Sequence, residues 1–150
     1  MRPPNIRRAI TAYPRWMNAD GLIKPIRCVL PNTFWEDAGN TIARQTGNIV
    51  KDNTFVQVFY TPDARQYIAP HLWLRLAEHE LDGYWTADLE QPPILVPWES
   101  DYEFDFATSD KTTRAENEFV RENPGAIRAA TINNNMRGTE RSMHISISGS

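Results

Sequence analysis

The sequence lacks the features of a disulfide-stabilised, membrane-spanning or exported protein. Cys28 is the single cysteine among 150 residues, so no disulfide can form within one chain, which fits synthesis in a reducing cytosol. No stretch approaches the ~20 consecutive apolar residues that a membrane-spanning helix needs. The N-terminus has no apolar run of the kind found in signal peptides, so export by the general secretory route is not expected.

The motifs of common enzymes are also missing. The sequence contains no G-x-S-x-G elbow, Walker loop, Rossmann glycine fingerprint or Cys-x-x-Cys pair. Its three histidines, His71, His79 and His144, do not form the H-E-x-x-H pattern of a zinc site. His144 stands two residues from both Ser142 and Ser146, but no third member of a catalytic triad is evident. We therefore expect a protein that is not an enzyme and that binds neither a cofactor nor a metal.

Charge is modest overall and uneven along the chain. The net charge of −3 does not suggest a protein that binds nucleic-acid phosphates. Residues 1–27 carry six basic side chains and one acidic side chain, a net charge of +5, which leaves −8 for the remainder. Four prolines fall within residues 1–25, and prolines at this density interrupt regular structure. We predict a basic, proline-rich arm over residues 1–25, with a short helix between Asn5 and Tyr13. Such an arm would dock on an acidic neighbour, touch nucleic acid or simply be solvated.

The remaining sequence has enough apolar residues to build one folded domain. Its hydrophobic fraction is 41% and its aromatic fraction is 11%. Runs of β-branched and aromatic residues predict short strands, namely at 26–30, 33–35, 54–60, 94–96, 126–132 and 143–148. A turn at Pro31-Asn32 is expected to separate the first two. Helical spacing of apolar residues predicts helices over 70–80 and 113–123. The predicted fold is mainly β (α+β), a small β-barrel or curled antiparallel sheet over residues 26–150 with one or two short helices and an extended N-terminal arm.

Two polar features need a separate interpretation. Residues 37–53 are polar and contain two glycines, which predicts an irregular hairpin or a long functional loop. Residues 102–106 alternate aromatic and acidic side chains, which predicts a half-buried strand. The acidic side chains Glu99, Asp101, Glu103 and Asp105 would then share one face. That face is either a solvated stripe or a channel lining that repels DNA phosphates.

The aromatic residues of the second half have mostly acidic neighbours. Aromatic platforms for single-stranded nucleic acid are interleaved with basic residues, and this chain lacks that arrangement. We therefore expect these aromatic side chains to fill the core or to contact another subunit.

An ordered series of motifs resembles a known family. The series includes the Val56–Phe59 strand, the tetrapeptide Gly83-Tyr84-Trp85-Thr86, the Ile94–Val96 strand, an Asn-rich turn over 133–138 and the alternating, glycine-ended strand 143–149. It is similar to minor capsid proteins encoded between the major capsid and tail genes of phages and prophages of Gram-positive bacteria, over residues 26–149. The sequence departs from that pattern in having Gln91-Pro92-Pro93 where Gly-Asp is expected, in having Ile145 where Trp is expected, and in its basic arm.

The resemblance implies a structural protein of the head–tail connector of a tailed phage. It implies a ring, of six or twelve copies, beneath the portal and adaptor and above a tail-completion or tail-terminator protein. Packaged DNA would pass without sequence-specific contact, no membrane would be involved, and the protein would reside in the virion after synthesis in the host cytoplasm. The role that fits best is the stopper, which closes the DNA channel. The alternatives are an adaptor or tail-completion protein of the same neck, a small-barrel oligonucleotide-binding protein, and a small hydrolase.

The resemblance also suggests which residues would act. The candidate channel loop comprises Asp37, Gly39, Asn40, Arg44, Gln45, Gly47, Asn48 and Lys51. The candidate subunit-contact residues are Arg7, Arg8, Arg15, Trp73, Trp85 and Trp98.

Overall fold

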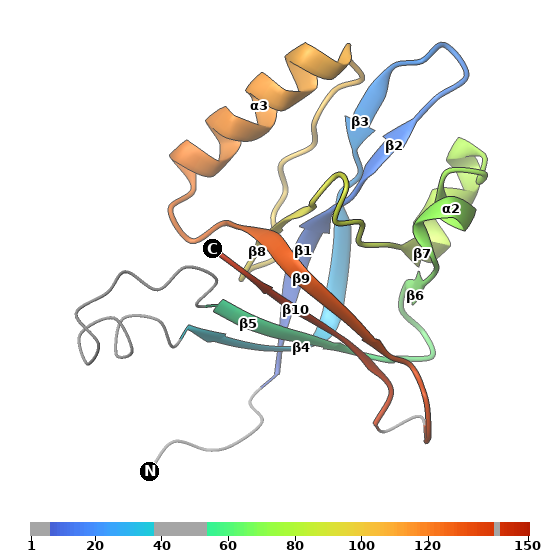
Figure 1. Cartoon of the computed structure of the whole chain (residues 1–150), viewed down its shortest axis with the longest axis vertical. Coiled ribbons are helices and arrows are strands. Elements are labelled where there is room, and N and C mark those ends of the chain that lie inside the picture. Colours follow the sequence, from blue (N-terminus) through green and yellow to red (C-terminus); the bar gives the residue numbers. More distant parts are fainter. Residues whose placement is uncertain (1–6, 38–53, 140–141) are drawn as a thin grey trace.

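Six antiparallel strands close into a small β-barrel in the computed structural model, which describes residues 7–37, 54–139 and 142–150 (Figure 1). The prediction of a mainly β fold built on a small barrel is thereby confirmed. In order around the barrel, the strands are β1 (Arg8–Tyr13), β4 (Cys28–Asp37), β5 (Thr54–Phe59), β10 (His144–Gly149), β9 (Ile127–Asn135) and β8 (Ile94–Val96).

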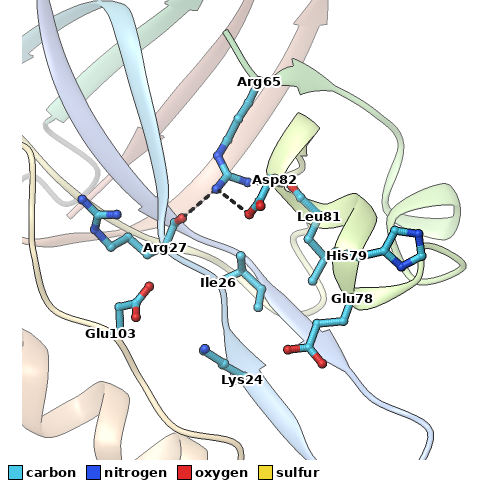
Figure 2. Close-up of a pocket in the computed structure, with 9 residues that line it drawn as sticks. All are labelled: Lys24, Ile26, Arg27, Arg65, Glu78, His79, Leu81, Asp82 and Glu103. Carbon is cyan, nitrogen blue, oxygen red and sulfur yellow. Dashed lines mark hydrogen bonds and ion pairs between the residues drawn. The ribbon is translucent and has the colours of Figure 1, made fainter.

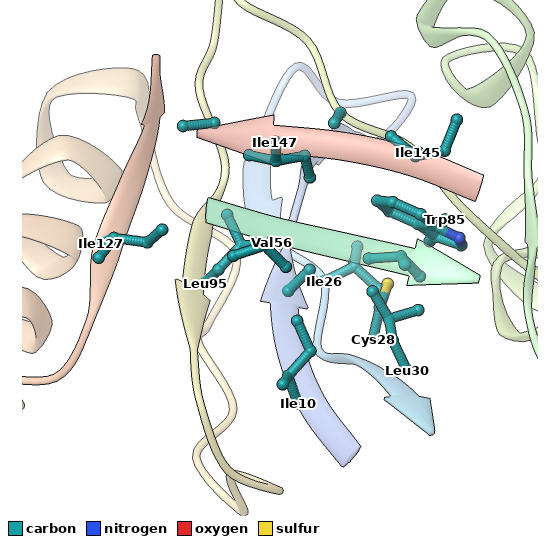
Figure 3. Packing of buried hydrophobic residues seen from close by; sticks show 14 of the residues in the cluster. Ile10, Ile26, Cys28, Leu30, Val56, Trp85, Leu95, Ile127, Ile145 and Ile147 are labelled. Atoms are coloured by element: carbon teal, nitrogen blue, oxygen red, sulfur yellow. The ribbon is translucent and has the colours of Figure 1, made fainter. Parts of the chain in front are cut away.

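Alternation of side chains along the strands explains the barrel's core. In β5, Val56 and Val58 are buried, whereas Phe55 and Gln57, which alternate with them, point to the outer face. In the neighbouring strand β10, Ile145 and Ile147 are buried in the core, and Ser146 between them is buried as well. Figure 3 shows the side chains of Val56, Ile145 and Ile147 within the buried cluster of the barrel. Because closure pairs every strand on two sides, the sheet is left without a long exposed edge.

The predicted turn at Pro31-Asn32 is wrong, because β4 continues through it. The first part of β4 pairs with β1 and the part from Thr33 onward pairs with β5. Pro31 lies where the register between β1 and β4 shifts. Such an irregularity tolerates the missing N–H of proline, so the strand bends there and changes partners.

The predicted N-terminal arm is corrected by the structure. Residues 8–13 form a barrel strand in which Ile10 and Ala12 have no exposed surface, so the described part of the predicted helix, from Arg8 to Tyr13, is a strand instead. The chain then continues into a hairpin of β2 (Arg15–Met17) and β3 (Ile23–Pro25). Its turn includes Gly21, whose φ of 78° lies in the region that favours glycine. Pro14 directly precedes this hairpin and Pro25 is the last residue of β3, so neither proline interrupts it.

The helices differ from the predicted ones in their limits. Helix α3 (Ser109–Glu122) begins four residues before the predicted Thr113, because the side chain of Thr108 caps it by accepting a hydrogen bond from the Lys111 amide. The predicted helix 70–80 is divided into α2 (Pro70–Trp73) and a 3-10 helix, η1 (Glu78–Gly83). A short parallel pair, β6 (Gln66–Tyr67) and β7 (Tyr84–Trp85), brackets these two helices.

A second, smaller core joins α3 to the barrel. The side chains of Tyr13, Phe104 and Phe119 contact one another edge to face or at a tilt, with ring centroids 5.2 to 5.3 Å apart. Residues 102–106 do not form the predicted strand. Phe104 instead turns into this cluster, so the segment lies as an extended connection from β8 to α3.

Candidate interaction surfaces

A cleft of mixed charge lies between the barrel and η1 (Figure 2). Its volume is about 600 Å³. It is lined by Lys24, Ile26, Arg27, Arg65, Glu78, His79, Leu81, Asp82 and Glu103. Three basic and three acidic side chains therefore share one opening, apart from the histidine, so the cleft favours neither anions nor cations.

Arg65 is a structural clamp in this cleft. Its guanidinium donates hydrogen bonds to the backbone carbonyls of Leu81 at 2.7 Å, Tyr84 at 3.0 Å and Arg27 at 3.2 Å. It also lies 3.8 Å from the carboxylate of Asp82, whose side chain is exposed. The planar fork of arginine suits this use, because several donors point at fixed acceptors. Arg65 therefore fastens η1 to the barrel, and its guanidinium is already engaged by groups of the protein.

Groups suited to metal binding do not gather in the described part of the chain, where no cluster of three or more His, Cys, Asp or Glu side chains is found. His144 is likewise separate from the neighbouring serine hydroxyls. Its Nδ1 lies 2.8 Å from the Ser142 carbonyl, and its Nε2 lies 3.4 Å from the Gln57 amide and 3.3 Å from the Asn135 amide. The Ser142 hydroxyl donates to the Thr139 carbonyl instead. This geometry does not activate a nucleophile.

Two of the predicted subunit-contact residues are core residues. Trp73 has no exposed surface, and its indole N–H donates to the Arg15 carbonyl at 2.9 Å. Trp85 is 2% exposed and packs edge to face against Tyr67. Both predictions are therefore corrected, because these side chains hold α2 and β7 on the barrel and cannot reach a neighbour.

Arg15 is also used within the subunit. It forms an ion pair with Glu116 on α3, whose side chain is 1% exposed. Arg7 and Arg8, in contrast, are on the surface. The Arg7 guanidinium lies 3.8 Å from the centroid of the Phe59 ring, and Arg8 makes a 3.4 Å hydrogen bond to the Pro97 carbonyl.

The candidate channel loop lies almost entirely outside the described residues. Gly39, Asn40, Arg44, Gln45, Gly47, Asn48 and Lys51 all fall in the undescribed range 38–53. Asp37 is the last residue of β4, and its carboxylate accepts a hydrogen bond from the hydroxyl of Thr54, its partner in β5. The two ends of the segment are thus held side by side at one position in the barrel wall.

The acidic stripe is present but differs from the predicted strand face. Glu99, Asp101, Glu103 and Asp105 are exposed along the connection from β8 to α3. Asp101 lies 4.0 Å from Arg27, an exposed pair that adds little stability. The stripe is therefore a solvated acidic surface.

An apolar groove between the β2–β3 hairpin and residues 74–78, the segment that joins α2 to η1, was not predicted from the sequence. Its volume is about 750 Å³, and its lining includes Trp16, Met17, Leu74 and Leu76. Met17 is 47% exposed and Leu74 is 52% exposed. The indole N–H of Trp16 is buried without a hydrogen-bond partner. The periodicity of the sequence conceals the groove because its two walls are separated by more than fifty residues.

One further surface carries a large exposed aromatic side chain. Trp98, a predicted contact residue, follows β8 and is 39% exposed. Its carbonyl accepts a hydrogen bond from the Thr11 hydroxyl at 2.9 Å. Its ring lies against Gly125, where a Cβ atom would come within 3.0 Å of it. Trp98 is thus available at the surface and held in place from beneath.

Among the described residues, no helix is long and apolar enough to cross a membrane. Comparisons of this chain with known protein families, with curated proteins and with solved structures find no match.

Proposed function

We propose that this chain is a ring-forming structural subunit of the head–tail connector of a tailed phage. The observation that carries the proposal is where the motifs of the resemblance lie in the fold. Gly83-Tyr84-Trp85-Thr86 contains β7, with Trp85 in the core and the Thr86 hydroxyl donating to the Ile68 carbonyl at 2.7 Å. The glycine-ended motif is β10, the strand between β5 and β9. The glycine-ended motif thus forms part of the barrel wall, and the tetrapeptide, which lies outside the barrel in the β6–β7 pair, places Trp85 in the main core.

The closed barrel is consistent with assembly through side-chain surfaces. A sheet without a long open edge does not associate by adding strands from a neighbour. Copies of such a subunit meet through patches and extended segments, and a head-to-tail contact with a suitable rotation closes into a ring. Exposed Trp98 and the apolar groove are patches of this kind.

Within the connector, we assign the chain the role of stopper. Asp37 and Thr54, the residues that flank the segment 38–53, are paired in the barrel wall, and the proposed channel loop would begin and end at this pair. The exposed acidic stripe from Glu99 to Asp105 is compatible with passing DNA, because carboxylates repel phosphates. On this proposal the ring of six or twelve copies seats beneath the portal and adaptor, and a tail-completion or tail-terminator protein binds below.

Imaging of intact necks tests the proposal. The genome that encodes this chain would be altered to add a tag after Ser150, which is exposed, and tailed particles would be purified. We expect a ring of density for the tagged subunit between portal and tail. Absence of the protein from complete particles, or its location only in the capsid shell or tail tube, would contradict the proposal. DNA binding by the purified chain that falls steeply with salt would favour the oligonucleotide-binding alternative.

A further inference from the structure

The apolar groove has the properties of a docking surface. It is open to solvent and lined by the exposed side chains of Met17 and Leu74, over Trp16, which is 6% exposed. The indole N–H of Trp16 is buried beneath these side chains without a hydrogen-bond partner. Two exposed carboxylates, Asp20 and Glu78, also line the groove. The partner should therefore present an apolar group beside a positive charge.

This same chain carries such a surface elsewhere. Trp98 is exposed and seated on Gly125, and Arg8 is tied beside it through its hydrogen bond to the Pro97 carbonyl. An aromatic ring held in place from beneath loses little conformational freedom on binding, and tryptophan and arginine are the side chains that most often dominate interfaces. The pair matches the groove in both apolar character and charge.

The two surfaces lie on different flanks of the molecule. In Figure 1 the β2–β3 hairpin, which forms one wall of the groove, lies at the upper right, and α2, which leads into residues 74–78 of the other wall, lies to the right. The C-terminal end of α3, which leads to the Gly125 site beneath Trp98, lies to the left. One chain therefore cannot join its own two surfaces, whereas successive copies can. Contacts of this heterologous type repeat from copy to copy.

We infer that the Trp98–Arg8 surface of one copy docks into the groove of the next, with Trp98 against Met17 and Leu74 and Arg8 facing Asp20 and Glu78. Closure of these contacts into a ring rests on the proposed function. The pairwise contact itself does not, because it follows from the shape and charge of the purified chain.

Intermolecular paramagnetic NMR on the full-length protein tests the contact. A spin label is attached through Glu99→Cys in an unlabelled copy, next to Trp98, and mixed with a ¹⁵N-labelled copy at high concentration. Cys28 does not compete for the label because it is fully buried. We expect the Trp16 indole N–H signal of the ¹⁵N copy to lose intensity selectively, together with the backbone amides of Met17 and Leu74. The same label attached through Asn133→Cys, on the outer face of β9, should leave these signals unchanged.

Variants make the result decisive. Trp98→Ala in the spin-labelled copy, or Leu74→Ser in the ¹⁵N copy, should abolish the selective loss. Phe55→Ser, which removes an equally exposed apolar side chain from the outer face of β5, should not. The charge reversals Arg8→Glu and Asp20→Arg should each weaken the effect, and combining them should restore it.

No selective broadening in the groove, or broadening that survives Trp98→Ala, would overturn the inference. A positive result together with a chain that is absent from phage necks would refute the proposed function and leave this contact standing. Particles whose necks contain the ring, but whose assembly is insensitive to Trp98→Ala, would support the proposed function and refute this contact.

Discussion

Arg15 of β2 and Glu116 of α3 form a two-point ion pair across 101 residues of sequence. The Arg15 Nε donates to one carboxylate oxygen at 3.2 Å, and an Nη donates to the other. Arg128 of β9 lies 3.9 Å from the same carboxylate. Because Glu116 is 1% exposed, its charge is satisfied by these arginines and not by water. The pair therefore joins the hairpin, the helix and the barrel at one point.

Removing one partner of this pair should be costly. Arg15→Ala leaves a buried carboxylate with only Arg128 nearby, and we expect a loss of about 3 kcal/mol in the free energy of unfolding. Urea denaturation followed by tryptophan fluorescence measures the loss. Arg114→Ala, on an exposed position of α3, is the matched control and should change stability by less than about 0.5 kcal/mol. Equal effects of the two variants would show that the ion pair does not stabilise the fold.

Gly149 should tolerate no side chain. A Cβ atom at this position would lie 2.0 Å from the backbone carbonyl oxygen of Arg128, at the register shift between β10 and β9. Gly149→Ala must displace a barrel strand, and we expect it to cost about 3 kcal/mol or to prevent folding. Gly83→Ala is the control, because nothing lies within 4 Å of its added Cβ atom. Thermal unfolding by circular dichroism compares the two, and similar melting temperatures would refute the predicted clash.

Cys28 should make stability fall at high pH. Burial raises the pKa of its thiol from an ordinary 9.0 to about 12, so the folded state holds this proton more tightly than the unfolded chain does. Its contribution is complete below pH 9 and is lost as the pH rises toward 12. We expect Cys28→Ala to flatten the decline of the unfolding free energy over this range. Buried Tyr13 and half-buried Tyr67, whose pKa values are also raised by burial, should retain part of the slope. An unchanged slope in the variant would contradict the prediction.

The segment between β4 and β5 should be dispensable for folding and needed for function. Its flanking residues Asp37 and Thr54 are paired, so replacing residues 39–52 with a short glycine linker should leave the barrel intact. On the proposed stopper role, phage carrying this deletion should assemble filled heads that lose their DNA. Quantitation of encapsidated DNA measures the effect, with the unaltered chain as the reference. Heads that retain DNA normally would exclude a stopper role for the segment.

The sequence predicted a strand correctly where the residues of that strand alone carried the pattern. Residues 54–59 alternate buried and exposed side chains over a β-branched run, and residues 94–96 are uniformly apolar and uniformly buried. The N-terminal strand was missed because four prolines and adjacent arginines suggested irregular structure. The burial of Ile10 and Ala12 depends on pairing with β4, which follows the β2–β3 hairpin, and with β8, which lies far along the chain.

The candidate interaction surfaces could also be predicted only in part from the sequence. The sequence could mark Trp73, Trp85 and Trp98 as large side chains in need of a partner, but it could not distinguish which partner each would find. Within the subunit, the Trp73 indole reaches the Arg15 carbonyl of β2, and Trp85 packs against Tyr67 of β6. Trp98, in contrast, remains 39% exposed. The groove, formed by a hairpin and the segment 74–78 distant from it in sequence, had no local signal at all.

The sequence by itself determined that this protein is a mainly β domain with no motif of a common enzyme, because strand periodicity and motif spacing are local properties of the chain. Only the tertiary structure decided that the sheet closes into a barrel including the N-terminal residues, that the Arg15 charge is consumed internally, and that an apolar groove and an exposed tryptophan lie on different flanks. Barrel closure and burial arise from pairings between distant segments, and their free energy depends on contacts that no single stretch of sequence contains.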